Sequence, residues 1–335
     1  MRCERTLRKK RNEIKPKILN RIHRFHGVIC GRFYLWIMNV EIVFDARDGV
    51  GESPVWREET QSLYWVDIVG KKIRSYNIEN GTNRDWSATD FPTALALEEK
   101  GEGGVIAFAG GISRWDGRDG FEPLVQPDPF SDNRLNEGKC DSRGRFWVGS
   151  MQTNLNPDGS MKEMNTHRGA LFRYDGGRRY ERLTAHEFGI PNTMAWSPDE
   201  RYFYCADTIR NIFFRYDYHP DEGLISNPTC WQLEQSSGAP DGSCIDHNGC
   251  LWNARFGGGC VLRITPQGKV DRVLRLPVSN PTSCTFGGKE GKELFITSAR
   301  FALSAEQLSR NPHEGALLAV ELEIGGKPEH RFQDG

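Results

Sequence analysis

Stretches in which apolar and polar residues alternate recur along the chain from Val40 onwards. Each follows a turn with Gly, Asp or Glu, and these stretches occupy residues 61–67, 104–109, 144–149, 201–207, 249–254 and 293–298. Alternation with a period of two is typical of β-strands. A second strand-like stretch follows each one, at residues 72–76, 111–115, 170–174, 212–216, 260–264 and 316–320. The pattern therefore predicts six β-hairpins.

Equivalent positions of these hairpins are 40 to 57 residues apart, measured at the marker residues Trp65, Ala107, Trp147, Tyr204, Trp252 and Ile296. Six units of that length indicate a β-propeller with four strands per blade, since a hairpin cannot bury both faces alone. We expect an all-β fold, a six-bladed β-propeller over residues 38–335. Its ring closes where strand 41–44 completes the blade ending at residues 317–322. One helical turn is predicted at 304–308, capped by Ser304.

The first 37 residues differ from the rest in charge. Residues 1–34 hold eleven of the 44 Lys and Arg, but only two of the 45 Asp and Glu. One interpretation is a disordered or loosely helical tail, and another is an arm attracted to phosphate or a membrane. A targeting segment is disfavoured because the apolar run 33–38 is short and follows directly on Arg32. We favour a fourth, in which the biological start is Met38 and residues 1–37 are a basic extension from a misassigned gene start.

Charge and composition argue against several classes of partner. The chain beyond residue 34 carries a net charge of −10, which argues against a nucleic-acid-binding core. No run of about 18 apolar residues occurs, so no membrane-spanning segment is expected. The nine Cys include no C-x-x-C pair, and we expect Cys205, Cys244, Cys250 and Cys284 to be core residues. Without a secretory signal, we expect free thiols, a cytoplasmic location, and a monomer or weak dimer.

Three oxygen-bearing side chains occupy matching places before the repeated strands. Glu52 precedes the first, Asn192 the fourth, and Asp241 the fifth, where it sits in a predicted turn, Gly238–Gly242. Loops at one end of a propeller converge on its axis, so equivalent positions meet there. Two carboxylates and an amide suit a divalent cation such as Ca²⁺, Mg²⁺, Mn²⁺ or Zn²⁺. The alternative for each residue alone is an ordinary turn acid or amide beside Pro or Gly.

A fourth polar stretch precedes the third repeated strand at residues 133–141. Alternation places Arg134 and Asn136 on one face. The planar fork of Arg134 suits a hydroxylated or anionic substrate, and Asn136 suits a metal-bound water. A solvated strand edge is the alternative.

From Met38 onwards the chain resembles the SMP-30/gluconolactonase/regucalcin-like family of six-bladed propellers. The motifs follow the family order and occupy residues 51–54 (GESP), 134–139 (RLNEGK), 144–151 (GRFWVGSM), 191–197 (PNTMAWS), 240–246 (PDGSCID) and 282–288 (TSCTFGG). The resemblance implies a metal-dependent lactonase with a central metal site. It implies Glu52, Asn192 and Asp241 as metal ligands, Asp241 also as general base, and Arg134 and Asn136 as substrate contacts.

Three features depart from the family pattern. Glu137 stands where many members have Asp, and the basic segment before Met38 has no counterpart. Asn154 lies where some members place a substrate-binding acid, so we expect Asn154 to contact substrate and the sugar preference to differ.

The expected reaction is hydrolysis of a sugar lactone, such as glucono-, arabinono- or xylonolactone, to the aldonic acid. A divalent ion stabilises the tetrahedral oxyanion and acidifies bound water, while Asp241 removes a proton from the attacking water. No G-x-S-x-G motif occurs, which disfavours a serine esterase. Two alternatives stay open: a phosphotriesterase or other esterase on the same metal platform, and a non-enzymatic calcium-binding propeller.

Overall fold

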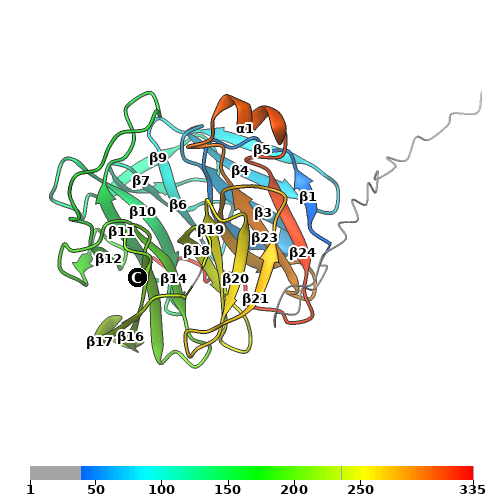
Figure 1. Cartoon of the computed structure of the whole chain (residues 1–335). Helices are drawn as coiled ribbons and strands as arrows, with labels where there is room; N and C mark the ends of the chain where they lie inside the picture. Colours follow the sequence, from blue (N-terminus) through cyan, green and yellow to red (C-terminus); the bar gives the residue numbers. More distant parts are fainter. Residues whose placement is uncertain (1–38, 235, 335) are drawn as a thin grey trace, which may run out of the picture. The chain divides into compact units, whose positions relative to one another are not determined.

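A computed structural model describes residues 39–234 and 236–334, which form six four-stranded antiparallel sheets. Contacts join β2, β6, β10, β14, β18 and β22 to one another in turn around a ring, so these strands are innermost. The described residues therefore form a six-bladed β-propeller, as the spacing predicted (Figure 1). Residues 1–37, predicted as a basic extension, lie outside the described residues.

The four strands of each blade follow one another from the innermost strand outwards. The first two blades are β2 (Gly51–Arg57), β3 (Ser62–Asp67), β4 (Lys72–Asn77), β5 (Asn83–Ser87) and β6 (Pro92–Leu97), β7 (Gly104–Phe108), β8 (Gly111–Trp115), β9 (Phe121–Val125). The third and fourth are β10 (Asn133–Cys140), β11 (Phe146–Gln152), β12 (Leu171–Tyr174), β13 (Tyr180–Arg182) and β14 (Pro191–Trp196), β15 (Tyr202–Asp207), β16 (Ile212–His219), β17 (Leu224–Trp231). The last two are β18 (Ala239–Ile245), β19 (Leu251–Phe256), β20 (Cys260–Ile264), β21 (Val270–Arg275) and β22 (Pro281–Gly287), β23 (Glu293–Ser298), β24 (Leu317–Glu321), β1 (Glu41–Phe44).

The ring closes through β1, which joins the sixth blade at its outer edge. β1 pairs antiparallel with β24, with Glu41 opposite Ala319, and Figure 1 shows the two strands side by side. This confirms the predicted closure. The repeated stretches of the sequence are the second and third strands of the blades, and the marker positions all lie on second strands.

The core consists of apolar side chains packed between neighbouring sheets. Clusters run from blade to blade; one, for example, joins Cys244 of β18 and Trp252 of β19 to Phe286 of β22. Cys205, Cys244, Cys250 and Cys284 are buried, as predicted. The seven cysteines of the described residues are all free thiols.

Two buried aspartates, Asp141 and Asp246, stabilise the turns that follow β10 and β18 by accepting hydrogen bonds. Asp246 accepts hydrogen bonds from the amides of Asn248 and Cys250, from the Trp252 indole at 3.0 Å, and from Arg263 Nε at 2.7 Å. Asp141 of the third blade does the same for its own turn, Trp147 and Arg145. A D-x-x-G-x-x-W sequence therefore builds one recurrent corner that holds first and second strands together.

The helical content is small. A 3₁₀ turn, η1 (Glu58–Thr60), joins β2 to β3, and helix α1 (Ala305–Arg310) precedes β24. Ser304 caps α1 and Gln307 completes a capping box, which confirms the predicted turn and its cap. No helix in the described ranges is long and apolar enough to cross a membrane.

Candidate functional site

Every innermost strand carries an irregularity in its pairing, close to its N-terminal end. The register shifts after Glu52, Pro92, Leu135, Asn192, Pro240 and Pro281. Ser53 and Thr193 accordingly have positive φ angles of 51° and 61°. An extra residue at a bulge re-aims the neighbouring side chains, here towards the centre of the ring.

Asp241 lies on a strand, which corrects the turn predicted for residues 238–242. Residues Ala239–Ile245 form β18, and Pro240 and Gly242 flank Asp241 at the bulge. Pro and Gly are tolerated there because an innermost strand is the edge of its sheet and its ladder is already interrupted.

The three predicted metal ligands come together in the centre of the ring. Asn192 Nδ2 donates to Asp241 Oδ1 at 2.8 Å and to Thr208 Oγ1 at 2.8 Å. The carboxyl of Glu52 lies against that of Asp241. All three residues are more than nine-tenths buried. Strands β2, β14 and β18 thus deliver two carboxylates and one amide to a single point.

The two carboxyl groups strongly perturb one another. Burial raises the pKa of Glu52 well above its ordinary value, and the charges of Asp241 and Glu137 raise it further. Burial and the charge of Glu137 also raise the pKa of Asp241, whereas a hydrogen bond with the Glu52 carboxyl lowers it. Two desolvated acids in contact resist joint ionisation, and a nearby cation relieves that cost.

Arg134, Asn136 and Asn154 also meet at this site. Asn136 Nδ2 donates to Asn192 Oδ1 at 3.0 Å, and Arg134 Nη1 donates to Asn136 Oδ1 at 2.8 Å. Arg134 Nε and Nη2 both donate to Asn154 Oδ1, at 3.2 and 3.0 Å. Arg134 and Asn136 are buried, so they do not form a solvated edge. Arg134 thus donates to both Asn136 and Asn154, and the three residues form one polar unit.

The residues present fit a divalent cation. Glu52 and Asp241 supply buried hard oxygen atoms, and their ionised carboxylates need a counter-charge. Asn192 adds an amide oxygen, which here accepts from Asn136 Nδ2. No trio of His, Cys, Asp or Glu is arranged to hold a metal among residues 39–234 and 236–334. A cation here would therefore use Asn192 as its third protein ligand.

Sequence reasoning missed two buried charged groups in the same channel. Glu137 and Lys139 of β10 are each 4% exposed, and burial raises the pKa of Glu137 to about 7. The bulge between Leu135 and Gly138 turns Glu137 and Lys139 to the side that Arg134 and Asn136 already face, while Leu135 packs in the core. The sequence does carry a signal for these two groups. Residues 134, 136, 137 and 139 are all polar, which breaks the strict alternation of a strand and indicates a bulge.

The sequence of this chain matches a known protein family over most of its length. Residues 50–300 match the sequence model described as SMP-30/Gluconolactonase/LRE-like region. Regucalcin of Danio rerio is 32% identical over 88% of this chain and 98% of its own length. The 6-deoxy-6-sulfogluconolactonase of Pseudomonas putida is 32% identical over 84% of this chain and 94% of its own.

Among solved structures, a luciferin-regenerating enzyme superposes with a TM-score of 0.80 and 27% sequence identity. The match covers 88% of this chain and 99% of that one. The family model and the relatives confirm the resemblance carried by the six sequence motifs. The chain therefore belongs to the SMP-30/gluconolactonase/LRE-like family.

Proposed function

We propose that this protein is a metal-dependent lactonase that hydrolyses a sugar lactone to the aldonic acid. The observation that carries the proposal is the buried contact of Glu52, Asp241 and Asn192 beside the polar unit of Arg134, Asn136 and Asn154. Relatives over nearly the whole chain include a protein named 6-deoxy-6-sulfogluconolactonase, which supports a lactone of a sugar acid as the substrate class.

Glu52, Asn192 and Asp241 would hold one divalent ion, of which Ca²⁺, Zn²⁺, Mn²⁺ and Mg²⁺ all suit oxygen ligands. When bound, such an ion stabilises negative charge on a carbonyl oxygen and lowers the pKa of water. Glu52 and Asp241 would both be ionised beside such a charge, although burial raises the pKa of each.

The chain's own groups supply the proton transfer and the substrate contacts. Asp241 accepts a proton from the water whose oxygen attacks the lactone carbonyl carbon. Asp241 then returns that proton to the ring oxygen as the carbon–oxygen bond breaks. Burial lowers the pKa of Arg134 to about 10, so Arg134 stays charged at neutral pH and orients substrate oxygens together with Asn136 and Asn154.

Some expectations from the sequence stay part of this proposal. We infer a cytoplasmic protein, a monomer or weak dimer, whose propeller domain begins at Met38 and which binds neither nucleic acid nor membranes.

The test is proton release from five- and six-carbon aldonolactones by metal-stripped protein, with single divalent ions added back. We expect metal-dependent acid production that is lost in Asp241→Asn. Arg134→Ala and Asn136→Ala are expected to abolish turnover while the metal still binds. If the metal-bound protein released no protons from any of the lactones, the proposal would be refuted and the phosphotriesterase or calcium-binding alternative favoured. Turnover that survives both substitutions would refute the assigned substrate face.

A further inference from the structure

Residues 325–334, which we call the strap, cross the ring at the C-terminal ends of the innermost strands. The strap leaves the fifth blade, where Gly326 bridges Asp246. Its Phe332 amide then donates to Leu97 O of the second blade at 2.8 Å, and its Gln333 amide to Gly144 O of the third at 3.0 Å. The candidate metal ligands lie near the opposite, N-terminal ends of these strands.

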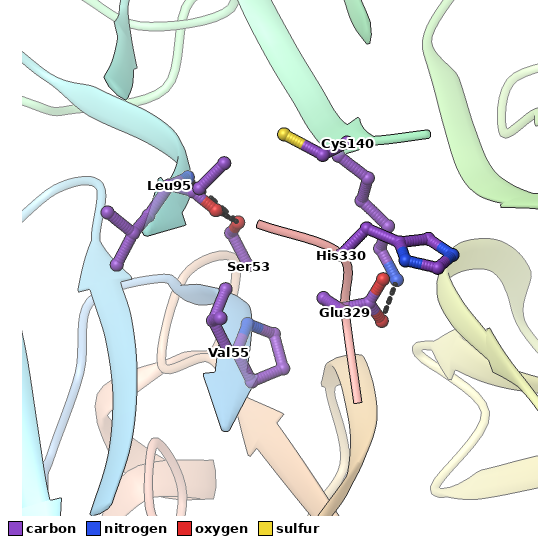
Figure 2. Close-up of a pocket in the computed structure, with 9 residues that line it drawn as sticks. Ser53, Val55, Leu95, Cys140, Glu329 and His330 are labelled. Atoms are coloured by element: carbon purple, nitrogen blue, oxygen red, sulfur yellow. Dashed lines mark hydrogen bonds and ion pairs between the residues drawn. The ribbon is translucent and has the colours of Figure 1, made fainter. Parts of the chain in front are cut away.

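One strap residue points its charge into the ring. Glu329 Oε1 accepts a hydrogen bond from Lys139 Nζ at 2.7 Å, and Figure 2 shows Glu329 next to His330 in a pocket that Cys140 also lines. The Lys139 side chain is 4% exposed and that of Glu329 is 15% exposed. The pair is therefore largely shielded from solvent, and removing one partner leaves the other charge without its counter-charge.

Lys139 connects this pair to the strand that carries Asp241. Its ammonium group also donates to the carbonyl oxygen of Ser243, two residues beyond Asp241 on β18. Thr193 Oγ1 donates to Asp241 O at 2.5 Å and accepts from Ser243 Oγ at 3.2 Å. Two sets of hydrogen bonds thus meet at Ser243: its carbonyl joins it to Lys139 and the strap, and its hydroxyl joins it through Thr193 to the backbone of Asp241.

The neighbouring carboxylates also keep the Lys139 side chain protonated. Burial alone would lower the pKa of Lys139, but the charges of Glu329 and Glu137 outweigh it and raise that pKa. Lys139 therefore stays protonated, and its ammonium group lies in the centre of the ring between Glu329 and β18. Its hydrogen bonds to the Glu329 carboxylate and to the Ser243 carbonyl of β18 fix its position.

We propose that Glu329 is a positioning residue of the metal site, holding Lys139 against the Ser243 carbonyl and thereby fixing the segment of β18 that presents Asp241. This inference rests on the proposed function, because it assigns the strap a role in metal binding and turnover. The strap then supports the metal site from the opposite ends of the innermost strands.

The experiment measures Mn²⁺ binding by electron paramagnetic resonance and glucono-1,5-lactone hydrolysis with Mn²⁺, in the full chain. Loss of a direct hydrogen-bond partner of a metal ligand weakens metal binding about 10–100-fold. Glu329 acts through Lys139 and the Ser243 carbonyl, so we expect Glu329→Gln to weaken Mn²⁺ binding by about 10-fold, the lower end of that range, and to lower kcat more than it raises KM. The matched control is Asp334→Asn, a strap carboxylate that pairs with half-exposed Arg114 at 3.4 Å. The control is expected to behave like the wild type.

Coupling through Lys139 is tested by a double-mutant cycle. If Glu329 acts through Lys139, Glu329→Gln has no further effect on Mn²⁺ affinity in a Lys139→Met background. Additive losses would overturn the proposed route. A Glu329→Gln protein with reduced thermal stability but unchanged Mn²⁺ affinity and kcat would show a purely structural strap and overturn the inference.

A variant that fails to fold is replaced by Glu329→Asp, which keeps the charge but shortens its reach. We expect an intermediate loss of Mn²⁺ affinity, and wild-type affinity would count against the inference. Wild-type protein that neither binds Mn²⁺ nor hydrolyses any lactone would remove the proposed function and this inference with it. A working wild type with Glu329→Gln indistinguishable from Asp334→Asn would remove this inference alone.

Discussion

Gly242 sits at a point where β18 lies tightly against β22, directly after Asp241. A Cβ added to Gly242 would lie 2.5 Å from Ser283 Cβ, 2.9 Å from Ser283 Cα, and nearer still to Ser283 Oγ. Real Cβ atoms essentially never come within 3.0 Å of such neighbours. Gly242 has no positive φ, so the obstacle is space and not backbone conformation. Gly242→Ala therefore forces β18 and β22 apart beside the candidate general base.

The size of the effect follows from the overlap. Relieving it needs a strand shift approaching 1 Å, and overpacking of this kind costs about 1–3 kcal/mol of stability. A 1 Å misplacement of a reacting group lowers rates about 100-fold. We therefore expect Gly242→Ala to fold with reduced stability and to lose about 100-fold in kcat/KM for its best lactone.

The assay is lactone hydrolysis with thermal unfolding on the same samples. Gly110→Ala is the matched control, because its nearest non-neighbouring atom would be 3.4 Å away, an ordinary contact. Ser283→Gly should partly rescue Gly242→Ala, since it removes Oγ and Cβ and leaves only the contact with the Cα of residue 283 at 2.9 Å. The Ser283 Oγ has no hydrogen-bond partner in the described structure, so its removal breaks no bond there. Wild-type turnover in Gly242→Ala, or no recovery in the double variant, would refute the view that strand spacing positions Asp241.

Two further predictions concern stability. Metal-free protein should lose thermal stability as pH rises from about 5 to 8, because Glu137 has a pKa raised to about 7 and the folded state then binds more protons than the unfolded state. Added Mn²⁺ should flatten this dependence, and stability that rises with pH would contradict the reasoning. Asp246→Asn should lower the free energy of unfolding in urea by about 3 kcal/mol, because Arg263 loses a buried partner. The control Asp199→Asn removes an exposed partner of Arg201 and should lower the free energy of unfolding by only about 0–1 kcal/mol. Equal losses in the two variants would contradict a stabilising role for the hydrogen bonds of Asp246.

The fold could be predicted from sequence because second and third strands of each blade repeat a simple pattern. Trp65, Trp147 and Trp252 recur at matching positions, and the alternation around them survives since these strands pack sheet on sheet. The innermost strands are harder to recognise. The bulge in β18 breaks the alternation, and its Pro and Gly mimic a turn, which is why residues 238–242 were predicted as one.

The candidate site was predictable only in part. Glu52, Asn192 and Asp241 could be found because they recur at equivalent points of separate blades. Lys139 and Glu329 could not, since their contact joins distant parts of the chain and no periodicity places a strap across the ring. The engagement of the Arg134 fork by Asn154 depends likewise on side-chain geometry that spacing does not encode.

The closure of the ring by β1 has a consequence for how the protein folds. Glu41 and Ala319 pair across nearly the whole described chain, so this contact has a very large sequence separation. Contacts of that kind form slowly, because the entropy of closing the loop must be overcome before the pairing stabilises anything. During synthesis β1 emerges first and its partner β24 last. β1 therefore stays without its partner until β24 has emerged, and an unpaired strand edge of this kind is prone to aggregation.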